Sequence, residues 1–136
     1  MNANEREIVI RRQGDTFGFK LPESHQLELR EGEDVQGRRL ADLRAAGNGG
    51  ETVTVVSIDE RDEEIEYVVE PTGDEPTGYP WPVLQEEQER LKMQWADAGG
   101  NVSQFAAWRP GTSQESQFRE WRAAIRRLRR GESPIG

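Results

Sequence analysis

Residues 52–58, Thr-Val-Thr-Val-Val-Ser-Ile, carry the strongest secondary-structure pattern in this chain. All of these residues except Ser57 are β-branched, a composition that favours an extended strand. An acidic turn (59–62) follows, and residues 64–70 then alternate, which places three apolar side chains on one face: Ile65, Tyr67 and Val69. Two strand patterns joined by a polar turn predict a β-hairpin over residues 52–70.

A second hairpin is expected nearer the N-terminus. Residues 7–12 (EIVIRR) place Ile8 and Ile10 on one face, and Gln13-Gly14-Asp15 is typical of a turn. Residues 16–21 (TFGFKL) then alternate, and residues 25–30 repeat the alternation more weakly. Together with the hairpin at 52–70, these strands predict a small antiparallel sheet.

One helix is expected beside this sheet. Leu40 and Leu43 have helical spacing within residues 38–46, and Gly47-Asn48-Gly49-Gly50 ends the pattern. The glycine-rich run lies between a predicted helix and a predicted strand, the reverse of the order in phosphate-binding loops, so we interpret it as a connection. We therefore expect residues 1–70 to form an antiparallel sheet domain with one helix.

The hydrophobic period changes after residues 71–80 (PTGDEPTGYP), which are rich in proline and glycine and which we interpret as a linker. Residues 81–131 are predicted to be a helical segment, and residues 132–136 a tail. Helices are expected at 83–98, 101–108 and 114–130, with Pro82 in a first helical position and Asn101 and Ser113 as N-caps. The predicted fold class is therefore α+β.

The composition argues against an enzyme. The 136 residues include no cysteine and a single histidine, His25, which excludes disulfides, a thiolate nucleophile and any multi-histidine metal site. The acidic run 59–66 lacks the glycine-pivoted loop of an EF-hand, and we interpret it as a solvated hairpin tip. His25 adjoins Ser24 without a nucleophile-elbow motif, which indicates an exposed loop residue. We expect no catalytic residue, no cofactor, no metal and no small-molecule substrate.

The distribution of charge and the hydropathy limit the kinds of partner that we expect for this protein. Residues 1–80 carry 19 Asp and Glu against 9 Lys and Arg, whereas residues 81–136 carry 7 against 9, so the net charges are −10 and +2. An acidic body repels phosphate, so we expect no nucleic-acid partner. The sequence also contains no apolar run of about 20 residues and no apolar N-terminal stretch, so we expect no membrane span and no signal peptide.

Aromatic residues at helical spacing mark the second part of the chain. Three short helices offer little other apolar surface for a core of their own, so these rings either pack as a core or leave an aromatic patch rimmed by arginine. The second interpretation predicts a partner-binding surface of eight residues: Trp81, Trp95, Trp108, Arg109, Phe118, Trp121, Arg122 and Arg126.

One resemblance is to the PDZ domain. Residues 16–21 (TFGFKL) resemble its carboxylate-binding loop and second strand, and the order of a GED turn, the LADLR segment and TVTVV is loosely similar. The stretch between Leu21 and Leu29 is shorter than the third strand and first helix of that fold. The resemblance implies capture of a peptide C-terminus at an open strand edge.

A second resemblance is to small virion and tail proteins of tailed bacteriophages. RRQGDTFGFKL resembles the opening hairpin of small phage β-domains, and FKLPESHQLELREG followed by LADLRAA is similar in layout to tail-assembly proteins. YPWPVLQEEQERLKMQW and FREWRAAIRRLRR resemble the helical C-terminal segments of tail and fibre-assembly proteins. The resemblance implies a structural or assembly role without catalysis, in the virion or the host cytoplasm.

The sequence thus predicts a protein–protein assembly component whose partners are other chains, either virion proteins or copies of itself. Two alternatives stay open. The acidic body suits an inhibitor or anti-defence protein that mimics nucleic acid, and the segment 16–21 suits a PDZ-like peptide-binding module.

Overall fold

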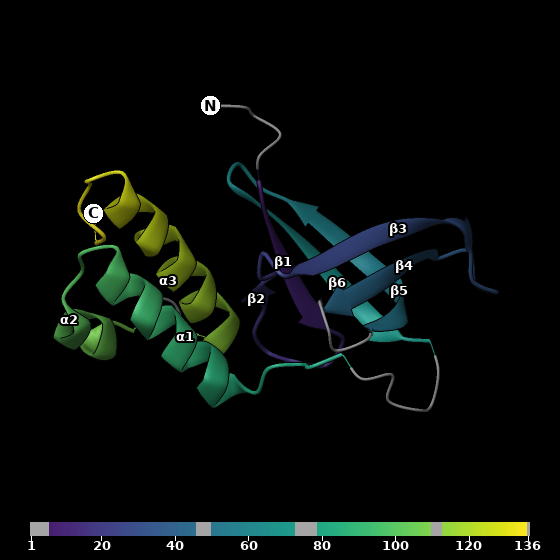
Figure 1. The fold of residues 1–136 in the computed structure, drawn as a ribbon, viewed down its shortest axis with the longest axis horizontal. Coiled ribbons are helices and arrows are strands. Elements are labelled where there is room, and N and C mark those ends of the chain that lie inside the picture. The colour runs from purple at the N-terminus through teal and green to yellow at the C-terminus, as the bar shows by residue number, and fades with distance from the viewer. Residues whose placement is uncertain (1–5, 46–49, 73–78, 110–112, 136) are drawn as a thin grey trace. The chain divides into compact units, whose positions relative to one another are not determined.

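The computed structural model describes residues 6–45, 50–72, 79–109 and 113–135. The chain divides into two compact units, Met1–Trp81 and Pro82–Gly136, which we call the sheet unit and the helical unit. The division falls at the end of the predicted linker 71–80, of which residues 73–78 lie outside the described residues. Strands fill the first unit and helices the second, so the predicted α+β class is confirmed (Figure 1).

The sheet unit contains six strands: β1 (Glu7–Arg12), β2 (Phe19–Lys20), β3 (His25–Glu33), β4 (Arg39–Ala45), β5 (Gly50–Glu60) and β6 (Glu64–Pro71). Their order in the sheet is β2-β1-β6-β5-β4-β3. Both predicted hairpins are present, although β2 is shorter than the predicted strand 16–21. The sheet is mixed rather than antiparallel, because β1 runs parallel to β6, with Ile8 opposite Ile65.

The helix predicted at residues 38–46 is wrong, because residues 39–45 form strand β4. Ala41, Leu43 and Ala45 are buried in alternation, and β4 pairs with β3 on one side and with β5 on the other. Ladder hydrogen bonds on both sides outweigh the helical preference of a Leu- and Ala-rich segment. Of the glycine-rich connection that follows, residues 46–49 lie outside the described residues, and Gly50 begins β5.

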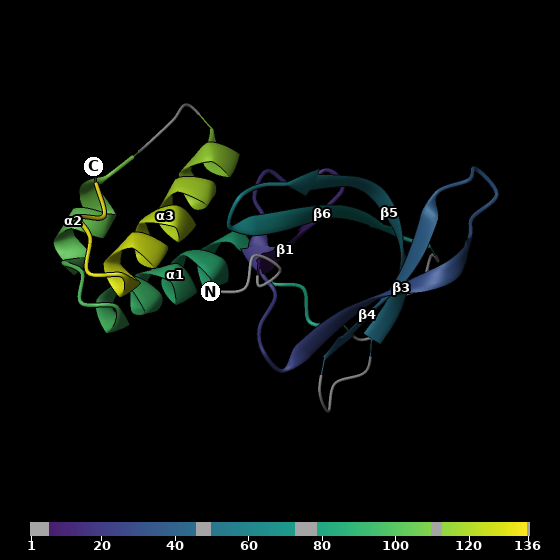
Figure 2. The same cartoon turned by 90° about the horizontal axis from the view of Figure 1, so that it is seen from above.

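The sheet is curved, as the view in Figure 2 shows. The core of the sheet unit lies on one of its faces. Residues of β1, β2, β4, β5 and β6 contribute to it, together with Tyr79 from the segment after β6, and the partly buried Leu27 of β3 packs against it. The buried members are Ile10, Phe19, Ala41, Leu43, Ala45, Val53, Val55, Val69 and Tyr79. Burial of these side chains is the main term that stabilises the sheet.

The opposite face of the sheet is covered in part by the chain between β1 and β2. Gly18 lies so close to this face that an added Cβ would approach Val9 Cγ1 to 2.8 Å and Glu66 Oε2 to 3.1 Å. Phe17 and Val9 are buried, and Arg11 donates a hydrogen bond to the carbonyl of Asp15. Only glycine fits at position 18 without displacing its neighbours.

The helical unit contains α1 (Leu84–Asp97), α2 (Val102–Ala107) and α3 (Gln114–Arg129). Both predicted N-caps are confirmed: Asn101 accepts hydrogen bonds from two backbone N–H groups of α2, and Ser113 accepts one from Ser116. Pro82 is not in a first helical position, because Val83 caps α1. Within the described residues, none of the helices has the length and hydropathy required to cross a membrane.

Candidate interaction surface

The helical unit is built around a cluster of aromatic rings. The ring of Phe105 stacks on Trp121 with centroids 4.3 Å apart, and it meets Trp95 edge-on at 5.5 Å. Phe118 packs edge-on against Trp121 at 5.3 Å. Trp95 further donates its indole N–H to the carbonyl of Asn101 at 2.8 Å, which ties α1 to the start of α2. Rings from all three helices therefore meet in a single core.

The exposed fraction of each side chain shows whether it can contact a partner. Trp95, Trp121 and Phe118 are 0%, 1% and 2% exposed, and Arg122 is 4% exposed. Of the two interpretations drawn from the sequence, Trp95, Phe118 and Trp121 follow core packing, because their rings pack on one another or on Phe105. While the helical unit is folded in this way, these three rings offer little surface to a partner.

Gly100 shows how tightly this core is packed. A Cβ at this position would lie 2.3 Å from Trp95 Nε1 and 2.8 Å from Leu128 Cδ1. The loop between α1 and α2 therefore needs glycine, because the indole of Trp95 fills the space that any side chain would take.

Trp108 and Arg109 extend this core to the surface. Trp108 caps the C-terminal end of α2, is half-buried and packs on Trp95 with ring centroids 6.1 Å apart. Arg109 is exposed, and its guanidinium lies 5.8 Å from the ring centroid of Trp121. A half-buried aromatic ring that packs on the core, followed by an exposed arginine, has the composition of a protein-binding hot spot.

Arg126 is half-buried on α3 and already interacts within the molecule. The neighbouring Arg127 donates from Nε to the carbonyl of Pro134, which holds residues after α3 against its last turn. The arginines that the sequence places at this end of α3 therefore serve in part to close the C-terminus of the helix.

Trp81 belongs to the sheet unit and not to the helical surface predicted from the sequence. Its ring meets Phe19 of β2 edge-on at 5.9 Å and Tyr79 at 5.1 Å, while the guanidinium of Arg12 lies 5.3 Å from its centroid. Tyr79 in turn meets His25, the first residue of β3, at 5.5 Å. Residues 79–81 thus contact both β2 and β3, the two ends of the strand order.

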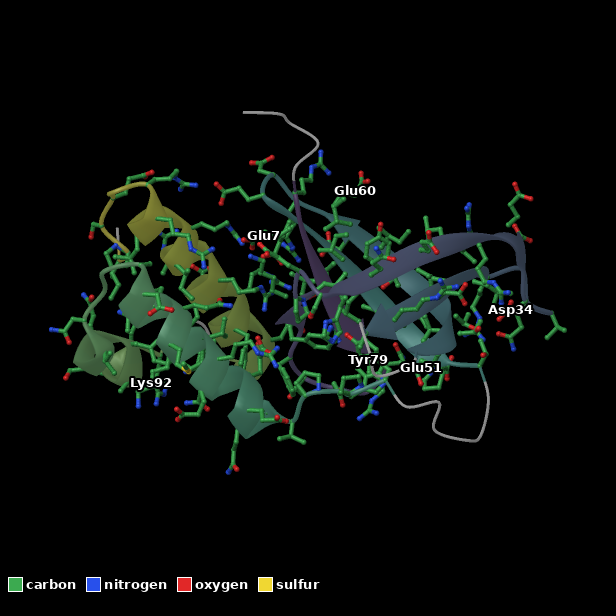
Figure 3. The ribbon with its side chains drawn as sticks, viewed as in Figure 1. Glu7, Asp34, Glu51, Glu60, Tyr79 and Lys92 are labelled. Atoms are coloured by element: carbon green, nitrogen blue, oxygen red, sulfur yellow. The ribbon has the colours of Figure 1, made fainter. Side chains whose placement is uncertain are left out.

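We call residues 79–81 the aromatic strap. Figure 3 labels Tyr79 and Glu51, both of which contact Trp81. His25 is correspondingly a half-buried strand residue rather than the predicted exposed loop residue, since it packs on the strap and shares a 2.9 Å hydrogen bond with Ser24.

Some acids of the sheet unit are paired with basic residues or buried, whereas others, such as Glu31, Glu33 and Glu60, are exposed. Arg38 joins Asp34 and Glu70, with distances of 2.9 Å and 3.0 Å. Arg30 and Arg44 both lie near Asp42, and Lys20 lies near Glu7. The interpretation of 59–66 as a wholly solvated tip is wrong at two positions, because Glu64 and Glu66 are 1% and 2% exposed.

Asp34 lies at the tip of the β3–β4 hairpin (Figure 3) and holds its turn. Its Oδ1 accepts from the backbone N–H groups of Gln36 and Arg38, and Oδ2 accepts from Arg38 Nε. The hydrogen bond from the backbone N–H of Arg38 is the main cause that lowers the pKa of Asp34. Both carboxylate oxygens of Asp34 thus accept hydrogen bonds from residues of the same turn.

Neither groove described in the sheet unit gathers a catalytic constellation. One of about 430 Å³ is lined by Glu23, Ser24, Gln26, Arg44 and Ala45. The other, of about 470 Å³, lies beside the Arg38 ion pairs. Within residues 6–45, 50–72, 79–109 and 113–135, no group of three or more His, Asp or Glu side chains is placed to hold a metal ion.

The PDZ-like layout also needs a helix where this chain has β4. Residues 19–20 do form an edge strand, but they pair only with β1 and are joined to β3 by a short connection. The helix that would form the second wall of a peptide groove is absent from the described part of the sheet unit, so the PDZ alternative loses its structural basis.

One residue that the sequence analysis did not single out is Glu87 on α1. Its side chain is buried, and Arg90 donates a 2.9 Å hydrogen bond to Oε2. Burial raises the pKa of Glu87 to about 7, although Arg90 and Arg122 act in the opposite direction. The sequence does indicate this burial, because Glu87, Leu91 and Trp95 are spaced so that all three fall on one face of a helix.

Comparisons of this chain with protein-family models, curated proteins and solved structures find no match. The case for a function therefore comes from the arrangement of the residues themselves.

Proposed function

We propose that this chain is a non-enzymatic assembly protein that contacts other protein chains through the Trp108–Arg109 surface of its helical unit. The observation that carries the proposal is the half-buried ring of Trp108, which is fixed on one side by Trp95 and stands next to the exposed Arg109. A rigid aromatic ring loses little conformational entropy on binding, and arginine adds directional contacts to acceptors of a partner.

The setting we propose is a tailed-bacteriophage particle, as one of its virion or tail structural or assembly components. This rests on the resemblance of the N-terminal hairpin segment and of the terminal helical segments to proteins of that class. The separation of a strand-built body from a helical unit supports the proposal, because it leaves one unit to hold position and the other to bind.

The alternative in which the acidic body mimics nucleic acid has less support, because part of its carboxylates are paired with arginine or buried. Mimicry needs exposed carboxylates at phosphate-like intervals, whereas Asp34, Asp42 and Glu70 are paired with arginine. Glu64 and Glu66 are removed from the surface by burial. We therefore retain the assembly function as the single proposal.

The experiment uses the tagged full-length chain, produced in the cell that encodes it while particles form. Lysates are separated on a density gradient, and the chain is followed by its tag. We expect the wild-type chain to sediment with particles or assembly intermediates. The double variant Trp108→Ala/Arg109→Ala should reduce this fraction by about tenfold, as expected for a hot-spot loss near 1.4 kcal/mol.

The matched control is Val83→Ala/Gln85→Ala, which alters two exposed residues of the same helical unit and should sediment as the wild type does. The proposal fails if the wild-type chain stays at the top of the gradient. It also fails if the Trp108 and control variants sediment alike, provided that both are folded by circular dichroism.

A further inference from the structure

Helix α1 buries a carboxyl group on its apolar face. Glu87, Leu91 and Trp95 follow one another at intervals of four residues, and all three are at most 1% exposed. Residues four apart lie on the same side of a helix, so Glu87 shares the face that packs the core of the helical unit. A carboxylate at such a position is costly unless all of its acceptor capacity is used.

The hydrogen bonding of Glu87 is incomplete. Oε2 accepts from Arg90 Nη1 at 2.9 Å, but Oε1 is buried and has no hydrogen-bond partner within the described residues. A half-paired carboxylate in an apolar setting is destabilised relative to the neutral acid, which carries no charge to desolvate.

The charged groups near Glu87 come from two helices. Arg122 of α3, itself buried, and Arg90 of α1 favour the carboxylate, whereas Glu86 of α1 opposes it. Helix α2, with the sequence VSQFAA, contributes no titratable side chain. Desolvation is the largest effect and outweighs both arginines, so the pKa of Glu87 rises from 4.5 to about 7.

We propose that Glu87 is a proton-operated switch within the helical unit: as a neutral acid it holds α1 packed against α3, and as a carboxylate it loosens that packing. The switch concerns the conformation of the helical unit and not its partner. Its test therefore does not depend on whether the proposed assembly function is correct.

The direction of the pH effect on stability follows from the linkage between proton binding and folding. In the unfolded chain Glu87 titrates near 4.5, whereas in the folded unit it titrates near 7, so the folded unit binds more protons between these values. Its stability is therefore highest at low pH and falls as the pH rises through this window. From pH 5 to pH 8 the equilibrium constant for opening should rise on the order of 50-fold through Glu87 alone.

The test combines two measurements on the full-length chain. Carbon-detected NMR titration follows the side-chain carboxyl of Glu87, with the exposed Glu89 of the same helix as reference. Amide hydrogen exchange, corrected for intrinsic rates, compares the protection of α1 at pH 5.5 and pH 8 in the wild type, in Glu87→Gln and in the control Glu89→Gln.

We expect Glu87 to titrate near neutrality and wild-type α1 to lose protection tens-fold at pH 8. Glu89→Gln should behave like the wild type, whereas Glu87→Gln, which imitates the neutral acid, should keep its protection at both pH values. A Glu87 midpoint near 4.5 overturns the proposal, and so does an equal loss of protection in Glu87→Gln. The wild-type titration alone decides the matter if the glutamine variant does not fold.

Discussion

Trp81 and Glu51 lie 30 residues apart in the chain, yet the indole Nε1 of Trp81 donates a 2.8 Å hydrogen bond to Oε1 of Glu51. This bond fixes the end of the aromatic strap to β5, next to the point where the helical unit begins at Pro82. The strap thereby completes the core of the sheet unit with Tyr79, which the sequence assigns to the linker, and Trp81, which it assigns to the helical segment.

Replacing Trp81 with phenylalanine should lower the free energy of unfolding of the sheet unit by about 1 kcal/mol. The variant keeps an aromatic ring against Phe19 and Tyr79 but removes the N–H donor to Glu51. Urea denaturation, followed by far-ultraviolet circular dichroism, measures the change, with Val83→Ala as a control two residues along the chain. Unchanged stability would show that the bond to Glu51 is not part of what holds the strap.

Replacing Gly18 with alanine should destabilise the sheet unit by about 1–3 kcal/mol, because the new methyl group overlaps Val9 Cγ1 and presses on the buried Glu66. Thermal unfolding of this variant can be compared with that of Glu23→Ala, which changes an exposed residue of the next connection. If both variants unfold at the same temperature as the wild type, the chain between β1 and β2 does not lie on the sheet as described.

Trp121 and Trp108 should respond differently to alanine. Trp121→Ala removes a fully buried ring stacked on Phe105 and should cost about 3–5 kcal/mol, enough to unfold the helical unit while the sheet unit stays folded. Trp108→Ala removes a half-buried ring and should cost less than half of this. Amide NMR spectra, which resolve the two units separately, provide the measurement. Equal losses would mean that Trp108 is a core residue rather than a contact residue.

Much of the fold could be predicted from local patterns. The β-branched run in β5, the alternation in β6 and the caps Asn101 and Ser113 each encode their structure within a few residues. The parallel pairing of β1 with β6 could not be predicted, because it joins segments more than 50 residues apart and no local pattern specifies such a partner. Segment 39–45 was misread because alanine at buried strand positions gives a weak alternation signal.

The candidate surface was predictable only in part. Helical spacing points to Trp95, Phe118 and Trp121 in the helices, but it misplaces Trp81, and spacing cannot tell a ring that faces a core from one that faces a partner. Trp95 and Trp121 are buried in the core of the helical unit, whereas Trp108 lies where α2 ends and is only half-buried. Glu87 was missed because a glutamate in a glutamate-rich helix is indistinguishable by composition from its exposed neighbours.

Site-specific photo-cross-linking in the cell that encodes the chain tests directly whether the Trp108–Arg109 surface contacts another protein chain. A photoreactive phenylalanine derivative is placed at position 108, and in a control at the exposed position 26 on β3. We expect irradiation to join position 108, and not position 26, to a second protein chain within the particle or its assembly intermediates. Cross-links from position 108 to nucleic acid, or none while the chain still sediments with particles, would contradict this expectation.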